Sequence, residues 1–374
     1  LKDTEIHDVN GFWALDQASG VNTFTVASNS TATYALVTDR GHDDGECASG
    51  GNCGGYGGVQ IIDVSNPSAI FATDAARDGA DGFTQLRGAN AADIFTIGSK
   101  TYAIVTSLGQ WDDGNNDAVQ IIDISNPSAI VAKDTFAHAN MQYPGGVETF
   151  TIGAKTYAAV AGNHANGGGG TSAATVQILD ISDPTNIVAK DSLVNSGSLE
   201  LNGAWYLDIF TVGSSTYAIV TGYDDDGVQI IDISDPDNIS AVGSLANSGS
   251  LKLDGADGVR TFTIGFSTYA IVAAVETYGA SDGGVQILQL STDISYFAAV
   301  QTIPTETLAL TDTITKEVEI QLSETLELTD SISKEADIPL SETLELTYTI
   351  SDSADISPTE TLALTDTITK EVEI

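Results

Sequence analysis

Short runs that alternate apolar with polar residues recur in a fixed order along most of the chain. Each unit starts with an apolar-Phe-Thr run, continues with a Tyr-Ala run and then reaches a Val-Gln-Ile run. Alternation of period two over runs this short predicts β-strands rather than helices. The first run occurs five times, at residues 23–26, 94–97, 149–152, 209–212 and 261–264.

The later runs repeat in step with the first and predict four strands in each unit. The tyrosines of the second run are Tyr34, Tyr102, Tyr157, Tyr217 and Tyr269. The third run starts at Val59, Val119, Val176 and Val228, with a degraded copy at Val285, and a turn containing Pro leads to a fourth strand, for example residues 129–135. Four short strands repeated five times predict an all-β fold, a five-bladed β-propeller with four-stranded antiparallel blades over residues 1–304.

The third run and its turn, residues 119–127 and their copies, resemble the LVIVD repeat of bacterial and archaeal surface proteins. Gln at the second position departs from the letters that name this repeat. The resemblance covers residues 20–300 and implies a propeller fold and a surface location. It implies no particular activity, and no catalytic residue can be carried over.

The last part of the chain, residues 305–374, has a different repeat, in which Glu306, Glu324, Glu342 and Glu360 begin equivalent 18-residue units. Its Leu, Ile and Val residues all fall at even positions, which predicts β-structure with one apolar face. This acidic, β-rich tail is expected to work as a stalk, by intramolecular coiling into a solenoid or by pairing with another chain to form a filament; a disordered stalk is the third reading. The units resemble tandem tails of surface proteins from marine ammonia-oxidising archaea.

The charge balance narrows the classes of partner. The chain has 52 Asp and Glu against 13 Lys and Arg, a net charge of -39. Such a field repels phosphate backbones and anionic lipid, so we expect no nucleic-acid partner, and no apolar run is long enough to span a membrane. Cations are the natural small partners, and calcium is the expected ion.

Residues 1–4 resemble the fourth strand of a unit. They are expected either to close the ring against the last blade or to follow further blades that precede them in the chain.

Two cysteines and two sequons point to an extracellular, cell-surface location. Cys47 and Cys53 lie in one Gly-rich loop, where contact costs little chain entropy, and predict a disulfide rather than a zinc site. Asn29 and Asn238 begin the sequences Asn-Ser-Thr and Asn-Ile-Ser, which are glycosylation acceptors.

The loops between second and third strands are long and variable, so this face is expected to carry the function. Acidic residues gather in three of these loops and suit calcium, which takes six to eight oxygen ligands; the alternative is ordinary turn chemistry. Arg87 and Arg260 come just before first strands. Two roles are open for them: pairing with acidic residues that line the central channel of the propeller, or a structural role. The candidate metal ligands are Asp43, Asp44, Glu46, Asp112, Asp113, Asp117, Asp224, Asp225 and Asp226.

The sequence therefore predicts an extracellular binding or structural protein and not an enzyme. A propeller on a stalk would act in adhesion or as a subunit of a surface layer or filament. Its expected partners are further copies of the chain, surface-layer components and surface glycans. The alternative is a secreted metal-dependent enzyme that uses His and Asp of the long loops, such as His42.

Overall fold

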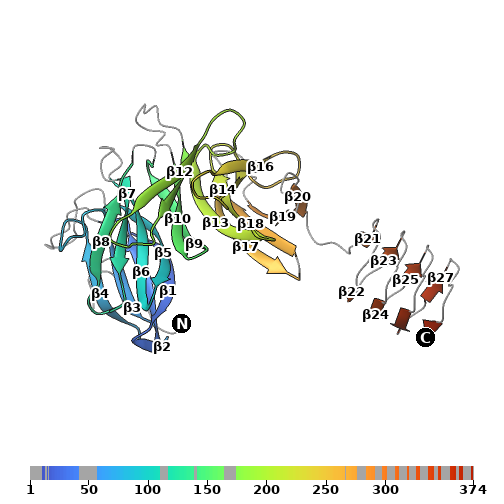
Figure 1. The fold of residues 1–374 in the computed structure, drawn as a ribbon, viewed down its shortest axis with the longest axis horizontal. Helices are drawn as coiled ribbons and strands as arrows, with labels where there is room; N and C mark the ends of the chain where they lie inside the picture. The colour runs from blue at the N-terminus through green and yellow to red at the C-terminus, as the bar shows by residue number, and fades with distance from the viewer. Residues whose placement is uncertain are drawn as a thin grey trace. The chain divides into compact units, whose positions relative to one another are not determined.

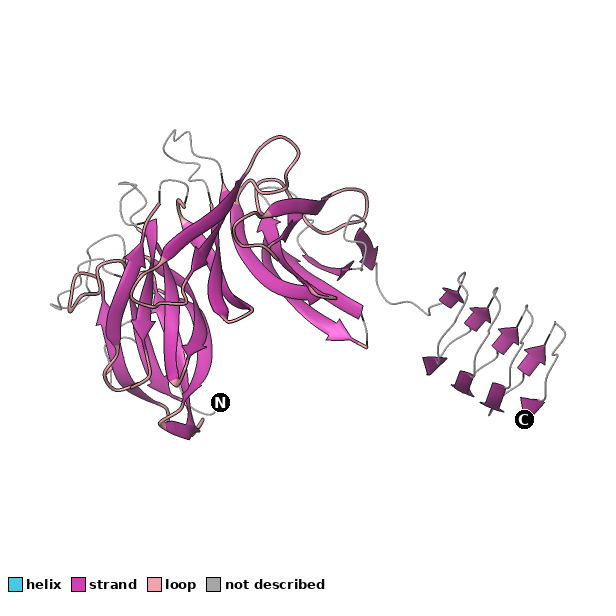
Figure 2. Ribbon diagram, viewed as in Figure 1, coloured by secondary structure: helices cyan, strands magenta, loops and turns pink. Residues whose placement is uncertain are grey.

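The computed structural model divides the chain into two compact units, residues Leu1–Val300 and Gln301–Ile374. In the first unit it describes residues 11–12, 15, 17–41, 57–109, 117–138, 141–163, 174–265, 267–275, 284–290 and 297–300; in the second it describes the strands alone. The described residues form strands, turns and loops and contain no helix (Figure 2). No helix long and apolar enough to cross a membrane is found in the described part. Residues 1–4, expected either to close the ring or to follow earlier blades, lie outside it.

Five four-stranded antiparallel sheets follow one another in the first unit, each in chain order (Figure 1). Blade 1 contains β1 (Ala18–Val26), β2 (Asn29–Asp39), β3 (Gly58–Asp63) and β4 (Phe71–Arg77); blade 2 contains β5 (Ala89–Ile97), β6 (Lys100–Leu108), β7 (Asp117–Asp123) and β8 (Val131–Phe136). Blade 3 contains β9 (Pro144–Ile152), β10 (Lys155–Gly162), β11 (Thr175–Asp180) and β12 (Val188–Val194); blade 4 contains β13 (Ala204–Val212), β14 (Ser215–Gly222), β15 (Gly227–Asp232) and β16 (Ser240–Ala246). Blade 5 contains β17 (Ala256–Ile264), β18 (Ser267–Ala274), β19 (Gly284–Leu290) and β20 (Phe297–Val300). The prediction of an all-β chain built from four-stranded antiparallel sheets is confirmed, and the number of sheets fits five blades.

Short turns with defined chemistry join the strands within a blade. Gly98, between β5 and β6, has a φ of 64°, a left-handed conformation that favours glycine in a tight hairpin. Between β7 and β8, the Asp123 carboxylate accepts a hydrogen bond from the Ser125 N–H at 3.1 Å. The Asn126 side chain accepts one from the Ser128 N–H at 3.2 Å. These side chains satisfy backbone donors in a turn that has no ladder partner.

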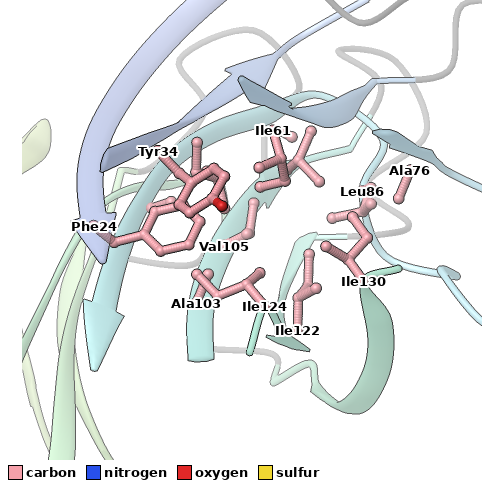
Figure 3. Packing of buried hydrophobic residues seen from close by; sticks show 14 of the residues in the cluster. Phe24, Tyr34, Ile61, Ala76, Leu86, Ala103, Val105, Ile122, Ile124 and Ile130 are labelled. Atoms are coloured by element: carbon pink, nitrogen blue, oxygen red, sulfur yellow. The ribbon is translucent and has the colours of Figure 1, made fainter. Parts of the chain in front are cut away.

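The hydrophobic core lies between consecutive blades rather than within one of them. We call the side of a blade that meets the next blade its leading face, and the side that meets the preceding blade its trailing face. The leading face of blade 1 contributes Phe24, Tyr34, Leu36, Val59 and Ile61 to the cluster shown in Figure 3. The trailing face of blade 2 contributes Ala92, Ala103, Val105, Ile122 and Ile124. Matching clusters join blades 2 and 3, 3 and 4, and 4 and 5.

Polar contacts link the second strand of one blade to the first strand of the next. The Thr38 hydroxyl of blade 1 donates to the Asn90 carbonyl of blade 2 at 2.7 Å. The Thr221 hydroxyl of blade 4 donates to the Asp257 carbonyl of blade 5 at 2.7 Å. Because each contact satisfies a backbone oxygen at an interface, the inner strands hold a defined register around the axis.

The second unit consists of two parallel four-stranded sheets whose strands pair one repeat apart. One sheet has the order β21 (Leu308–Leu310), β23 (Leu326–Leu328), β25 (Leu344–Leu346) and β27 (Leu362–Leu364). The other has the order β22 (Val318–Glu319), β24 (Ala336–Leu340), β26 (Ala354–Pro358) and β28 (Val372–Glu373). Leu326 pairs with Leu308 on one side and with Leu344 on the other. The 18-residue units thus pair with each other within the chain.

Candidate functional site

The first strands of all five blades line one cavity of about 100 Å³. Because the start of each first strand pairs with the end of the second strand, as Ala18 does with Asp39, the cavity lies toward the face that carries the long loops. This is the face on which the sequence placed the function. The polar side chains that line the cavity are Ser19, Asn22, Asn90, Glu148, Tyr206 and Arg260.

A single register position supplies most of the charge near this cavity. It is the position two residues before the Phe of each first strand, where each strand would otherwise continue its apolar pattern. A strand presents alternate residues on one side, so this position recurs at the same depth in every blade. Its occupants are Asn22, Asp93, Glu148, Asp208 and Arg260.

Arg260 of blade 5 joins three blades through its guanidinium group. Its Nη1 lies 2.5 Å from Glu148 Oε1 of blade 3 and 3.7 Å from Asp208 Oδ1 of blade 4. The same nitrogen donates to the Leu207 carbonyl at 3.4 Å. Of the two roles that the sequence left open for Arg260, pairing with acids of the channel is the one found.

Glu148 is the carboxyl group most affected by this environment. Burial, followed by the charge of Asp93, raises the pKa of Glu148 from 4.5 to about 7, although Arg260 lowers it. Its side chain is 20% exposed, so the group is both enclosed and open to the cavity. A carboxyl group with this pKa exchanges a proton near neutral pH and can donate or accept a hydrogen bond.

Beside the cavity, Arg40 contacts both an aromatic ring and Asn90, one of the residues that line it. The Arg40 guanidinium lies 6.0 Å from the centre of the Trp205 ring and donates two hydrogen bonds to the Asn90 side chain, the Nε bond at 2.8 Å. Burial raises the pKa of the Asp257 carboxyl, and the charge of Arg40 opposes that rise. Trp205 and Tyr206 are half-buried and pack edge to face, with ring centres 6.2 Å apart.

The acidic residues predicted as calcium ligands fare differently. Asp224, Asp225 and Asp226 form the turn between β14 and β15, where Asp225 accepts from the Asn202 N–H at 2.7 Å and Asp226 from the Gly255 N–H at 2.8 Å. Asp117 is the first residue of β7 and is 9% exposed. Within the described ranges, no group of three or more His, Cys, Asp or Glu side chains is arranged to hold a metal ion. Calcium binding stays a prediction.

Other predicted site residues lie outside the described part of the chain: Asp43, Asp44, Glu46, Asp112, Asp113, and the expected disulfide partners Cys47 and Cys53. Both sequon asparagines are described and exposed. Asn29 begins β2, and Asn238 lies in the turn before β16, so both side chains are accessible on the surface.

Sequence reasoning missed Asp93, Glu148 and Asp208 as a set. The available signal was the polar residue two positions before the Phe in all five units, because a buried first strand has little reason to keep charge there. The first strands were predicted to begin at Thr149 in blade 3, one residue after Glu148, whereas β9 begins at Pro144. The site therefore fell just outside the expected strand.

A comparison with known protein families agrees with the repeat. The family model of the LVIVD repeat matches residues 55–72, 113–137 and 215–246. No protein in a search of curated sequences matches the chain. Among solved structures, a thermostable family-43 glycoside hydrolase is 12% identical, with 76% of this chain and 93% of that chain covered and a TM-score of 0.43.

Two further solved structures are similar at the same level. An α-L-arabinofuranosidase from Lactobacillus brevis is 11% identical, with 74% of this chain and 91% of that chain covered and a TM-score of 0.45. A GH32 β-fructofuranosidase from Bombyx mori is 9% identical, with 76% and 63% covered and a TM-score of 0.39. The prediction that the chain is not an enzyme is corrected here, because its propeller-like structural neighbours are glycoside hydrolases. Their activities belong to those proteins.

Proposed function

We propose that this chain is an extracellular, cell-surface protein in which a five-bladed propeller on a repetitive stalk binds the polar end group of a surface glycan at the axial cavity. The observation that carries the proposal is the convergence of five first strands on one cavity lined by Asn22, Glu148, Tyr206 and Arg260. Binding sites of this kind combine apolar walls with a few convergent polar groups that orient a ligand.

The size and chemistry of the cavity favour an end group rather than a whole oligosaccharide. About 100 Å³ holds a few water-sized groups, far less than a pocket for a large ligand. Glu148 and Asn22 offer hydrogen-bond acceptors, while Arg260 offers donors in a planar fork. The Trp205 ring beside the cavity gives a flat apolar surface, on which a ligand with both polar and apolar parts can pack.

The surface location rests on separate observations. The sequons at Asn29 and Asn238 are exposed. The predicted disulfide between Cys47 and Cys53 belongs to an oxidising compartment. The tail forms its own compact unit with parallel strands paired one repeat apart, an arrangement that suits a spacer between the propeller and the surface. A glycan-binding site carried on such a spacer suits a role in adhesion.

A glycan array probed with the full chain tests the proposal. We expect binding to one group of related glycans, and a loss of at least tenfold in affinity in Glu148→Gln and in Arg260→Gln. Lys155→Gln serves as the matched control, because Lys155 makes its ion pair with Asp180, at the opposite end of β10 from the cavity. Unchanged binding in both Glu148→Gln and Arg260→Gln would show that the glycan does not bind in the cavity. Release of a sugar from a bound glycan would show that the cavity also catalyses.

A further inference from the structure

The leading face of blade 5 stands out when the five blades are compared position by position. In blades 1 to 4 the next blade covers the centre of this face. Twelve equivalent positions in the second and third strands are all 0% exposed: Leu36, Ile104, Ala159 and Ile219; Val59, Val119, Val176 and Val228; Ile61, Ile121, Ile178 and Ile230.

Blade 5 keeps apolar residues at the same positions, yet they reach solvent. Ile271 is 38% exposed, Val285 is 60% exposed, and Ile264 at the end of β17 is 62% exposed. Phe262 and Tyr269 form the same ring pair as in the other blades, with centres 5.6 Å apart, but both are only half-buried. A contiguous apolar sheet face of this kind is a mark of an interaction surface.

The charge of this face distinguishes it from the rest of the protein. The strands β17, β18 and β19 contain one acidic residue, Asp257, which is half-buried. Two copies of a chain with net charge -39 repel each other over most of their surfaces. A face without exposed carboxylates is where that repulsion is weakest and the gain from apolar burial is largest.

We infer that a second copy of this chain covers the leading face of blade 5, with the two blade-5 faces packed against each other about a two-fold axis. At the opposite end of the blade row, part of the trailing face of blade 1 is already covered by residues of the same chain. There, Ala35 and Ile62 on the trailing face of blade 1 are buried against Phe12, with Leu15 packed on the same cluster. A self-complementary contact closes at two copies, and face-to-face packing of sheets is a standard way to bury such surfaces.

Sedimentation equilibrium of the full chain over a dilution series tests this inference. We expect a monomer–dimer equilibrium, with a dissociation constant raised at least roughly 30-fold by Ile271→Asp or by Val285→Asp, because each places an unpaired carboxylate in the interface. Matched controls are Val131→Asp and Val188→Asp. Their side chains are 50% and 44% exposed on the fourth strands of blades 2 and 3, and both variants should keep the dimer.

Three results would overturn the inference. The first is an unmodified chain that stays monomeric at the highest concentration measured. The second is equal weakening by the control substitutions. The third is weakening by Val21→Asp as strong as that by Ile271→Asp, because Val21 is 66% exposed on the trailing face of blade 1 and would report a head-to-tail contact. Val285 is more exposed than Ile271, so Val285→Asp gives an answer even if Ile271→Asp unfolds.

Discussion

Glu148 differs from the two aspartates that share its register position. Asp93 accepts hydrogen bonds from the Thr149 N–H at 2.8 Å and from the Thr149 hydroxyl at 2.6 Å. Asp208 accepts the same pair from Thr261, at 2.5 and 2.8 Å. Both aspartates therefore clamp the backbone of the next blade, whereas Glu148 has the side chain of Arg260 as its partner. Of the three carboxyl groups, Glu148 is the one that can exchange its hydrogen-bond partner without breaking a contact to the backbone of a neighbouring strand.

The raised pKa of Glu148 predicts a loss of stability as pH rises. Between pH 4.5 and about 7 the folded state keeps the Glu148 proton and the unfolded state loses it, so the free energy of unfolding falls through this window. The full effect is about 3 kcal/mol and is complete above pH 7. Urea unfolding of the chain and of Glu148→Gln at several pH values measures it. The difference between the two curves should change across this window; parallel curves would contradict the pKa.

The Gln of the third-strand motif, which departs from the letters of the LVIVD repeat, has a physical role. Gln229 is 2% exposed, and its Nε2 donates to the Gly243 carbonyl of β16 at 2.6 Å and to the Ile230 carbonyl at 3.0 Å. Its Oε1 accepts from the Glu200 N–H at 3.1 Å. One buried amide thus joins the third strand, the fourth strand and the connection between blades.

Replacement of this amide should destabilise the propeller. We expect Gln229→Leu to lower the free energy of unfolding by about 1–3 kcal/mol, because the half-buried Gly243 carbonyl and Glu200 N–H both lose the hydrogen bond to the Gln229 amide. Urea unfolding gives the value. A loss below about 0.5 kcal/mol would mean that water replaces the amide or that the segment relaxes.

At the scale of elements, residues with strong β-propensity and residues with fixed turn roles could be read from the sequence. The Val-Gln-Ile runs became third strands, and the Asp-Ile-Ser-Asn-Pro turns have the side-chain-to-backbone bonds that their residues favour. The start of β9 could not be read. Pro144, Gly145 and Gly146 have low β-propensity and take strand geometry because the chain pairs with β10 and lies close to blade 4.

The close approach of Gly145 to blade 4 also explains why the local sequence pattern did not predict the candidate site. A Cβ added to Gly145 would lie 2.4 Å from the Trp205 carbonyl oxygen, so tertiary packing selects glycine there. The contact between Gly145 and Trp205 joins residues about sixty positions apart, and no periodicity in the sequence predicts it. The cavity forms from such contacts between blades, and the repeat predicts the blades without predicting which of their residues meet at the axis.

The clamp between fourth strands and the next blade gives an element-scale prediction. Asp191 of β12 accepts from the Ile239 N–H of the turn before β16 at 2.9 Å. Asp191→Ala should cost about 1–3 kcal/mol in urea unfolding, because the Ile239 N–H loses its acceptor at the blade interface. Asp183→Ala is the control and should cost clearly less, since the Asp183 carboxylate accepts hydrogen bonds within its own exposed turn, from the N–H and hydroxyl of Thr185. Equal costs would mean that the contact between blades adds nothing.

At the scale of the whole molecule, the change of repeat after residue 304 predicted a propeller and a separate tail. The chain divides between Val300 and Gln301. The 18-residue period predicted β-structure with equivalent positions one repeat apart. The strand partners could not be derived, because one period serves pairing within a chain and between chains equally well. The structure pairs Leu344 with Leu326 and with Leu362 of the same chain.

Calcium binding is a whole-molecule prediction, because several of its expected ligands lie in long loops of different blades. Calcium in millimolar excess should raise the melting temperature of the chain relative to excess chelator, since an ion that binds only the folded state stabilises it by mass action. Burial and the charges of Asp225 and Asp226 raise the pKa of Glu200, a mutual repulsion that a bound cation would relieve. Identical melting temperatures would leave these acids as turn residues.

The most direct test of glycan binding at the axial cavity is a structure of the full chain with a glycan selected on the array. We expect the polar end group of the glycan within hydrogen-bond distance of Glu148 and Arg260, in the cavity that the five first strands line. A glycan bound instead on the outer strands of a blade, with the cavity unchanged, would contradict it.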